Sequence, residues 1–176
     1  MTTITISTEE LKALTIAAFC KAGFTKADAD TVAEILVTTD LMGISTHGVH
    51  RIEQYLKRVR AGVVPAQPEI KVIDKAASLA VVDGGSGQGQ VVGARALESA
   101  LTKAIKTGIG FVSVGNSNHF GAMAPYGFAA TVAGVILISG TTASPSMTPF
   151  GGRDQILGNN PIGFAAPRKG GAPFIL

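Results

Sequence analysis

The pattern of apolar residues changes near residue 62, and this change constrains the fold more than any other feature. Up to Gly62 the apolar residues recur three and four positions apart, which is the spacing of amphipathic helices. From Val63 onwards short β-like runs alternate with glycines, which is typical of strands. The sequence therefore predicts an α/β protein with a helical segment over residues 1–62 and a layered α/β domain over residues 63–176.

Three helices are expected in the first part. Ser7 with Glu10 matches a capping box at the start of the first helix, and Thr25 with Asp28 opens the second. The third is expected from about residue 46 to residue 60. Each helix carries an apolar stripe that we assign to the core. On the third helix this stripe consists of Ile52, Tyr55, Leu56 and Val59.

Five apolar runs are expected to form strands, namely EIKVI, SLAVVDGG, GFVSV, GVILISG and PIGFAAP. Helical patterns over about residues 90–107 and 124–133 lie between them. This alternation favours a layered sandwich whose sheet is covered on both faces. The chain ends in the apolar run GGAPFIL, as though a further strand had begun. Because chain ends are usually exposed and frayed, we expect this to be the N-terminal part of a longer chain.

Composition narrows the class of protein. Hydrophobic residues make up 46% and charged residues 15%, which is typical of a compact globular chain. The densest basic run, from Lys57 to Arg60, lies at a predicted helix end, where cations are favoured, so no nucleic-acid partner is expected. Cys20 is the only cysteine, which fits a reducing compartment. No apolar stretch approaches the roughly 20 residues that span a bilayer, and the N-terminus lacks a secretory pattern. We therefore expect a cytoplasmic protein without membrane contact.

The run DGGSGQGQVVGARA resembles a dinucleotide-binding turn between a strand and a helix. That turn uses G-x-G-x-x-G to bring pyrophosphate to a helix N-terminus. Here Gly87 and Gly89 are followed by Gly93, so the third glycine comes one residue late. The acidic residue expected about 20 positions later is also missing. A flexible turn with tight helix packing is at least as good an interpretation.

A second motif, DLMGISTHGVHRIEQY, places His47 and Arg51 four residues apart, after Ser45 or Thr46 as the expected helix cap. Arg51 can hold a carboxylate through two hydrogen bonds, and the positive end of a helix keeps a histidine poised to exchange protons near neutral pH. Alternatively, His47 only supplements the cap and Arg51 pairs with Glu53 or Asp40. His47 and His50 could form a metal pair, but no further ligands are evident, so no metal is expected.

The third motif is the loop NSNHFG, which carries His119. His119 follows a predicted strand, and ligands in α/β sheets gather beyond the carboxyl ends of strands. A hydrogen-bonding site is the simplest explanation. The segment GNSNH also resembles a nucleophile elbow with Ser117 as nucleophile and His47 or His119 as base, but the closing glycine is replaced by His119. Further along, Asn159 and Asn160 precede Pro161 in an extended turn, and Gly151 and Gly152 allow a close backbone approach.

Together, GISTHGVHRI, VDGGSGQGQVVG, NSNHFG, PFGG and GNNPI occur in an order and at separations that resemble the malate/L-lactate dehydrogenase family. That family also includes ureidoglycolate dehydrogenases, sulfolactate dehydrogenases and reductases of cyclic imino acids. The resemblance covers nearly the whole chain. It implies NAD or NADP bound on a non-Rossmann α/β fold, a homodimer, and family members about twice as long as this chain.

The resemblance also implies roles for individual residues. His47 matches an acid/base histidine supported by Thr46, and Arg51 matches the residue that binds the substrate carboxylate. His119 matches a proton-accepting histidine, with Phe120 and Gly121 beside the nicotinamide. Asn159 and Asn160 match a turn on the substrate side. Which of the two histidines moves the proton is left open.

The implied function is hydride transfer between NAD(P) and a small 2-hydroxy or 2-oxo acid that resembles malate or lactate. A cyclic imino-acid reductase or a ureidoglycolate dehydrogenase would use the same residues. Two interpretations of another class also stand: a serine hydrolase built on Ser117, and a fragment without catalytic activity. The substrate and the choice between NAD and NADP do not follow from these residues.

Overall fold

A computed structural model describes residues 5–176 of the chain. By the contacts among its residues, the chain forms two compact units, one that ends at Tyr126 and one from Gly127 to Leu176. The predicted division into residues 1–62 and 63–176 separates helical from mixed sequence, and it stays a prediction. No helix in the described part of the chain is both long and apolar enough to cross a membrane.

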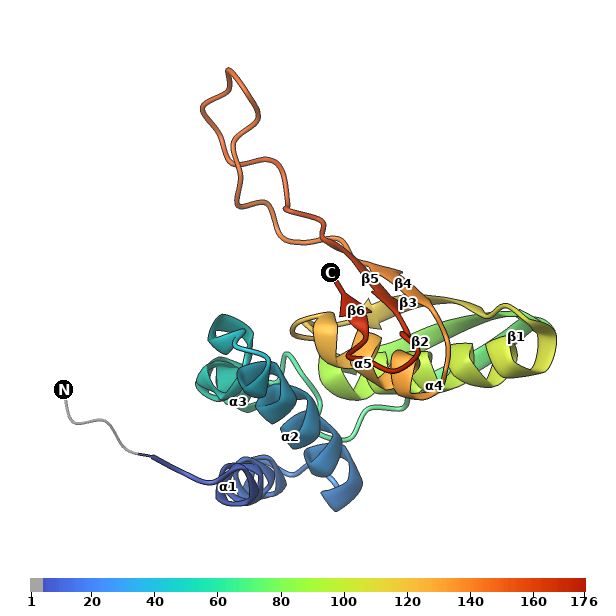
Figure 1. Ribbon diagram of the computed structural model, residues 1–176. Coiled ribbons are helices and arrows are strands. Elements are labelled where there is room, and N and C mark those ends of the chain that lie inside the picture. Colours follow the sequence, from blue (N-terminus) through green and yellow to red (C-terminus); the bar gives the residue numbers. More distant parts are fainter. Residues whose placement is uncertain (1–4) are drawn as a thin grey trace. The chain divides into compact units, whose positions relative to one another are not determined.

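The first unit begins with α1 (Thr8–Lys21), α2 (Lys26–Leu41) and α3 (Ile52–Arg60), which gather together in Figure 1. The predicted capping box is confirmed: Ser7 Oγ accepts a hydrogen bond from Glu10 N, and Ser7 N donates to Glu10 Oε2. Thr25 Oγ1 likewise accepts from Asp28 N at the start of α2. These caps satisfy backbone groups that would otherwise lack partners, so the sequence pattern was sufficient to position both helix starts.

The helices share a core that extends to the sheet-covering helix of the same unit. Phe19 and Phe24 meet edge to face at 5.1 Å, and Val32 and Leu36 of α2 are fully buried beside them. Val91, from the first turn of α4 (Gly89–Thr107), belongs to the same cluster. The helical segment is therefore packed directly onto α4.

The predicted third helix differs from the structure at its start. Two 3-10 turns, Ser45–His47 and Val49–Arg51, precede α3, and neither Ser45 nor Thr46 caps a helix through its side chain. Gly48 lies between these turns with a non-helical ψ of −147°, and the Asp40 carboxylate accepts a hydrogen bond from Val49 N at 2.9 Å. The expectation that His47 and Arg51 share one helix face was thus wrong, because the partly buried Asp40 carboxylate binds the backbone at Val49 and holds this segment away from the α-helical path.

The first unit also contains a three-stranded sheet in the order β1 (Lys71–Ala76), β2 (Leu79–Gly87), β3 (Phe111–Ser117). β1 pairs with β2 antiparallel, and β3 pairs with β2 parallel. Parallel pairing needs a crossover, and α4 supplies it. Val82 of β2 packs against Val92 and Ala96 of α4, so one face of the sheet is covered by that helix.

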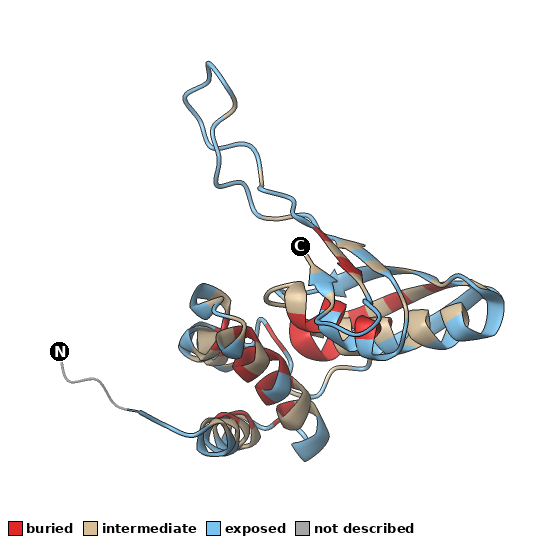
Figure 2. Cartoon of the chain, viewed as in Figure 1, coloured by how far each residue is buried: buried red, intermediate tan, exposed pale blue. Residues whose placement is uncertain are grey.

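The expectation of one sheet covered on both faces is wrong for this chain. Every residue of β1 and all of β3 except Val112 are exposed, whereas burial in β2 is concentrated at alternate positions. Figure 2 shows the corresponding red patches on α2, on β2 and at the start of α4. Apolar runs indicated the strands correctly, but they did not indicate how many of their faces are covered.

In the second unit, β4 (Leu137–Gly140), β5 (Ile162–Ala166) and β6 (Phe174–Ile175) form a separate antiparallel sheet. α5 (Ala124–Val132) begins in the first unit and continues into the second. Residues 141–161 extend away from β4 and β5 as a long exposed loop, with a bridge between Met147 and Leu157 (Figure 1). The expected final strand is present as β6.

Gly89 allows the closest backbone approach that matters to the site. A Cβ atom at Gly89 would collide with the backbone carbonyl groups of Asn118 and His119. The loop after β3 therefore lies directly on the first turn of α4. In the same run, Gly87 is covered by Pro68 and Gly93 by the ring of Tyr126. The glycines thus serve packing, which is the second of the two interpretations that the sequence allowed.

Replacing Gly89 by Ala should lower the free energy of unfolding by about 1–3 kcal/mol, because the added methyl group must push the backbone of the loop away from α4. Gly115→Ala is the matched control, since Gly115 lies next to the same loop and a Cβ there meets no atom within 4 Å. Urea unfolding of both variants gives the comparison. Equal stabilities would show that the contact at Gly89 is not tight.

Candidate active site

The loop that carries His119 is anchored at Asn118. Asn118 Nδ2 donates to the carbonyl oxygens of Ser86 at 2.7 Å and Gly87 at 3.1 Å, while its Oδ1 accepts from Arg58 Nη2 at 2.7 Å. From the sequence, Arg58 was only part of the basic run at a predicted helix end. Arg58 links α3 to the loop that carries His119, so the position of His119 depends on two elements that are distant in sequence.

His119 projects from this loop against Tyr55 and His47. Tyr55 Oη lies 2.7 Å from His119 Nδ1, and the two ring centroids are 5.9 Å apart. The ring centroids of His47 and His119 lie 5.6 Å apart. His119 is exposed as a residue, but the Nδ1 side of its ring is covered by the buried Tyr55. The Nδ1 edge is therefore packed, while the residue as a whole stays accessible.

Tyr55 is held in turn by two buried glutamines. Gln90 Nε2 donates to Tyr55 Oη at 3.0 Å, and Gln88 Nε2 donates to Gln90 Oε1. Both glutamine residues are almost completely inaccessible to solvent. The sequence analysis missed this series of hydrogen bonds, because it assigned Tyr55 to an apolar stripe and the two glutamines to a turn. Two glutamines that alternate with glycines just before a buried helix turn were the available signal.

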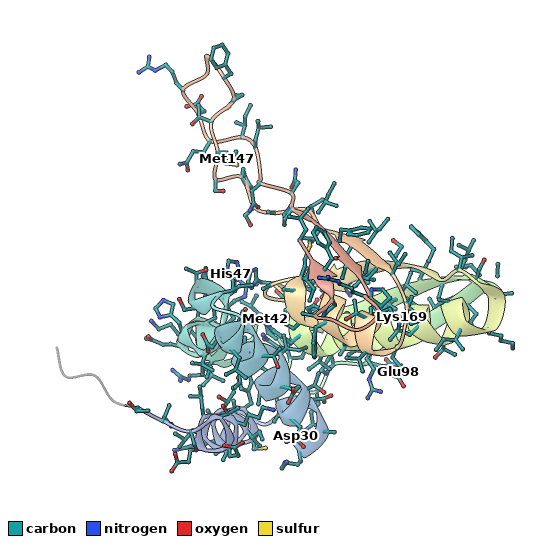
Figure 3. The ribbon with its side chains drawn as sticks, viewed as in Figure 1. Asp30, Met42, His47, Glu98, Met147 and Lys169 are labelled. Atoms are coloured by element: carbon teal, nitrogen blue, oxygen red, sulfur yellow. The ribbon has the colours of Figure 1, made fainter. Side chains whose placement is uncertain are left out.

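His47 lies beyond the C-terminal end of α2, which Met42 marks in Figure 3. Thr46 Oγ1 is 2.9 Å from His47 Nδ1. Arg51 Nε donates to the Thr46 carbonyl at 2.6 Å, and Arg51 Nη1 donates to Gln54 Oε1 at 2.8 Å. These bonds fold the segment so that Thr46, His47 and Arg51 come together without sharing one helix face.

The charge of Arg51 has no carboxylate partner among residues 5–176. The two acids considered as its partners are engaged elsewhere: Glu53 pairs with Lys57, and Asp40 accepts from Val49 N. The alternative in which Arg51 pairs with one of these acids is therefore wrong. An unneutralised guanidinium beside two histidines is a local positive centre suited to an anion.

Both histidines are shifted towards the neutral form. Partial burial and then the nearby charge of Arg51 lower the pKa of His47 below 6.5. Partial burial lowers the pKa of His119 in the same direction, with further contributions from His47, Arg51 and Arg58. Desolvation and positive neighbours both disfavour imidazolium, so both rings favour the neutral form, which can accept a proton.

Phe120 and Gly121 complete the loop. The Phe120 ring packs against Tyr126 at a centroid distance of 5.2 Å, and its carbonyl accepts from Tyr126 Oη at 2.7 Å. Gly121 has a φ of +88°, which favours glycine, and it lies close to Gln90. Burial raises the pKa of Tyr126 well above 10, so this hydroxyl is a stable donor to the loop. These contacts orient the segment directly after His119.

Two other kinds of site find no support here. Among residues 5–176 no group of three His, Cys, Asp or Glu side chains is arranged to hold a metal ion. Ser117 Oγ lies 3.5 Å from the Asn118 carbonyl, and within the same residues it makes no hydrogen bond to His47 or His119. A serine hydrolase needs that bond between nucleophile and base.

The profile of one family, described as malate/L-lactate dehydrogenase, matches residues 6–176. This chain belongs to the malate/L-lactate dehydrogenase family. The predicted resemblance is therefore confirmed, and the mixed α/β fold agrees with the structures of family members.

Two relatives and one solved structure illustrate the match. The chain is 43% identical over 173 residues to a malate dehydrogenase from Pyrococcus abyssi, covering 98% of this chain and 48% of the relative. It is 40% identical over 157 residues to an L-sulfolactate dehydrogenase from Methanocaldococcus jannaschii, covering 89% and 46%. The structure of malate dehydrogenase from Pyrococcus horikoshii OT3 superposes with a TM-score of 0.94 at 42% identity, covering 98% of this chain and 49% of that one. This chain spans about half the length of these relatives.

Asn159 and Asn160 lie in the second unit. Asn160 Oδ1 accepts from Ala143 N at 2.8 Å across the long loop, and its φ is +36°. The six candidates Thr46, His47, Arg51, His119, Phe120 and Gly121 all belong to the first unit.

Replacing Arg51 by Gln should raise the pKa of both His47 and His119, because it removes a positive charge that disfavours imidazolium. NMR titration of the histidine ring protons measures both values. Arg95→Gln removes an exposed cation of α4 that pairs with Glu98, and it should leave both titrations unchanged. An unchanged titration in the Arg51 variant would mean that its field does not reach the pair.

The lowered pKa values of His47 and His119 determine how the stability of the protein changes with pH. The two histidines have lowered pKa values in the folded protein, so the stability that they contribute is complete above about pH 6.5 and is lost as the pH falls through those lower values. The Arg51→Gln variant should lose less stability between pH 7 and pH 5 than the unaltered protein does. Urea unfolding at several pH values measures this difference.

Proposed function

We propose that this protein transfers a hydride between NAD or NADP and a small 2-hydroxy or 2-oxo acid of the malate or lactate type. One observation carries the proposal: the rings of His47 and His119 lie 5.6 Å apart, near the Arg51 guanidinium, which pairs with no carboxylate among residues 5–176. Membership of a dehydrogenase family supports it. Because the chain spans about half the length of these relatives, the activity of the whole protein is also a proposal.

Arg51 binds the substrate carboxylate in this proposal. Its bonds to the Thr46 carbonyl and to Gln54 use two N–H groups and fix the plane of the guanidinium. Its remaining N–H groups can donate to an anion in a forked arrangement. A carboxylate held there presents C2 and its oxygen to the neighbouring histidines, and such positioning lowers the barrier to reaction.

The nicotinamide would be held at His119, Phe120 and Gly121. This segment fits a flat ring, because His119 is accessible and Gly121 has no side chain. The glycine run before α4 does not fit the pyrophosphate, since Pro68 and the loop backbone occupy that space. When bound, the cofactor supplies or accepts the hydride at C4 of its ring. Both NAD and NADP remain within the proposal, because the described residues do not distinguish the ribose groups.

The proton moves through one of the two histidines. During oxidation a neutral imidazole takes the hydroxyl proton as the hydride leaves C2, so that the C–O bond becomes a carbonyl. In the opposite direction the imidazolium returns that proton to the oxygen. The lowered pKa of both histidines keeps the base form populated at neutral pH. Thr46 orients His47 through their hydrogen bond.

The substrate is an acid of the class named by the relatives. One relative is a malate dehydrogenase and another an L-sulfolactate dehydrogenase, and both names refer to a 2-hydroxy acid with a second acidic group.

Asn159 and Asn160 are proposed to contact the substrate side of the site. Homodimerisation and a cytoplasmic location also belong to the proposal. The family resemblance supports the first, and the single cysteine supports the second.

The experiment that tests this function is oxidation of NADH and NADPH by the intact protein with a panel of 2-oxo acids, followed through loss of nicotinamide absorbance. Oxaloacetate, pyruvate, sulfopyruvate and a cyclic imino acid separate the dehydrogenase from the reductase. Turnover with a 2-oxo acid is expected. Turnover only with the imino acid would replace the proposal by its alternative, and failure to bind either cofactor would contradict it.

Arg51→Gln should raise KM for the oxo acid by about 10- to 150-fold, which corresponds to losing about 1.5–3 kcal/mol of hydrogen bonding to a charged group. Arg51→Lys should fall between that variant and the unaltered protein, because lysine keeps the charge but not the fork. Arg95→Gln is again the control. Steady-state kinetics measures all three, and an unchanged KM in Arg51→Gln would remove Arg51 from substrate binding.

His119→Ala should lower kcat by about 10²- to 10⁴-fold, which is the range for loss of a positioned proton-transfer or hydrogen-bonding group. Its effect on the free energy of unfolding should be small by comparison, because the residue is exposed. Turnover and urea unfolding are compared on the same sample. Unchanged turnover would remove His119 from the mechanism.

A further inference from the structure

The hydrogen-bonded chain that ends at His119 has a direction. A tyrosine hydroxyl has one hydrogen. Tyr55 Oη accepts a hydrogen bond from Gln90 Nε2, and among residues 5–176 its one other partner is His119 Nδ1, so the hydroxyl hydrogen of Tyr55 is donated there. His119 Nδ1 is then an acceptor. A neutral imidazole whose Nδ1 accepts must carry its hydrogen on Nε2.

The direction follows from the buried end of the chain. As arranged, Gln88 Nε2 donates to Gln90 Oε1, and Gln88 Oε1 is the one buried side-chain nitrogen or oxygen of the described residues that lacks a hydrogen-bond partner. Reversing every bond would leave the amide N–H groups of Gln88 without an acceptor, beside the positive N-terminus of α4. Orphaned buried N–H groups are rarer than undersatisfied carbonyl groups, so the observed direction is favoured.

His47 is under no such constraint. Its Nδ1 meets the exposed hydroxyl of Thr46, and in the described residues this hydroxyl makes no other hydrogen bond. A hydroxyl can donate to Nδ1 or accept from it, with water completing its remaining bonds. His47 can therefore present either an N–H group or a lone pair at Nε2.

We propose that the chain from Gln88 through Gln90 and Tyr55 holds neutral His119 with its proton on Nε2, so that His119 donates a hydrogen bond to the substrate oxygen and His47 accepts the proton. Tyr55 and Gln90 are positioning residues in this scheme. The inference rests on the proposed function for its substrate, but the protonation state of His119 is a property of the protein alone.

The proton balance of the step is complete. The O–H bond of the hydroxy acid breaks, its proton goes to Nε2 of His47, and the hydride leaves C2 for the nicotinamide. His119 keeps its Nε2 hydrogen throughout and stabilises the charge on the oxygen as it changes. In the opposite direction the imidazolium of His47 returns the proton while His119 polarises the carbonyl.

The groups that face the two histidines agree with this division. Arg51 lies near both histidines, and Arg58 and Tyr55 also face His119. Protonating His119 on Nδ1 would require Tyr55 to give up its donated bond, because Tyr55 Oη already accepts from Gln90. Protonating His47 only requires the Thr46 hydroxyl to turn. The proton is therefore more readily accepted by His47.

Nitrogen-15 NMR of the histidine rings tests the protonation state without cofactor or substrate, because protonated and unprotonated ring nitrogens have different shifts. His119 should carry its hydrogen on Nε2 in the unaltered protein. Tyr55→Phe should give a mixture of tautomers. Gln90→Glu should move the hydrogen to Nδ1, because a carboxylate can only accept from Tyr55. Tyr126→Phe removes a comparable buried hydroxyl from the same loop and should keep the Nε2 form.

Two results would overturn the inference: a hydrogen on Nδ1 in the unaltered protein, or an unchanged tautomer in both Tyr55→Phe and Gln90→Glu. These outcomes are separate from failure of the proposed function, which would appear as a lack of hydride transfer or of nicotinamide binding. If Tyr55→Phe does not fold, Gln90→Glu still gives the decisive comparison.

The pH dependence of oxidation distinguishes the two histidines. Glutamine can donate a hydrogen bond but cannot take up a proton at neutral pH. His119→Gln should therefore retain at least 10-fold more activity than His47→Gln and should keep the loss of kcat/KM at acidic pH. His47→Gln should remove that acidic limb. Loss of the limb in His119→Gln and not in His47→Gln would assign the proton to His119 and overturn the inference.

Discussion

The first turn of α4 lies directly against the backbone of the His119 loop, and the rest of the candidate site depends on this contact. Gly89 permits it because any side chain there would collide with the carbonyl groups of Asn118 and His119. The same turn carries Gln90 and Val91, which reach Tyr55 and the core of the N-terminal helices. One close approach thus joins the loop, α4 and the helical segment.

Buried polar groups give this junction its geometry. Isolated amides in an apolar core are costly, and the glutamines are tolerated because each is hydrogen-bonded in a chain that leads to the surface at His119. Tyr55 has two roles, since it belongs to the same core cluster as Leu36 and Phe19 while its hydroxyl contacts His119. Packing and chemistry are therefore coupled at Tyr55, so a substitution in the core would also alter the geometry of the candidate site.

Local sequence was informative wherever structure depends on near neighbours. The caps at Ser7 and Thr25 use residues three positions away, so their patterns were sufficient. It failed at residues 45–51, where Asp40 binds Val49 N and two 3-10 turns replace the expected helix start. It also failed for the sheet, because the coverage of a strand is decided by elements elsewhere in the chain.

The sequence by itself determined the family and the order of helices and strands, because these follow from residue types and their spacing along the chain. The roles of His47, Arg51 and His119 came from the family resemblance and stay predictions. Only the tertiary structure decided that His47 and His119 lie side by side, that Arg51 lacks a carboxylate partner, and that Tyr55 and two buried glutamines meet His119. Tyr55 and His119 are 64 positions apart. Contacts over such separations depend on the packing of whole elements, and the spacing of residues along the chain does not reveal them.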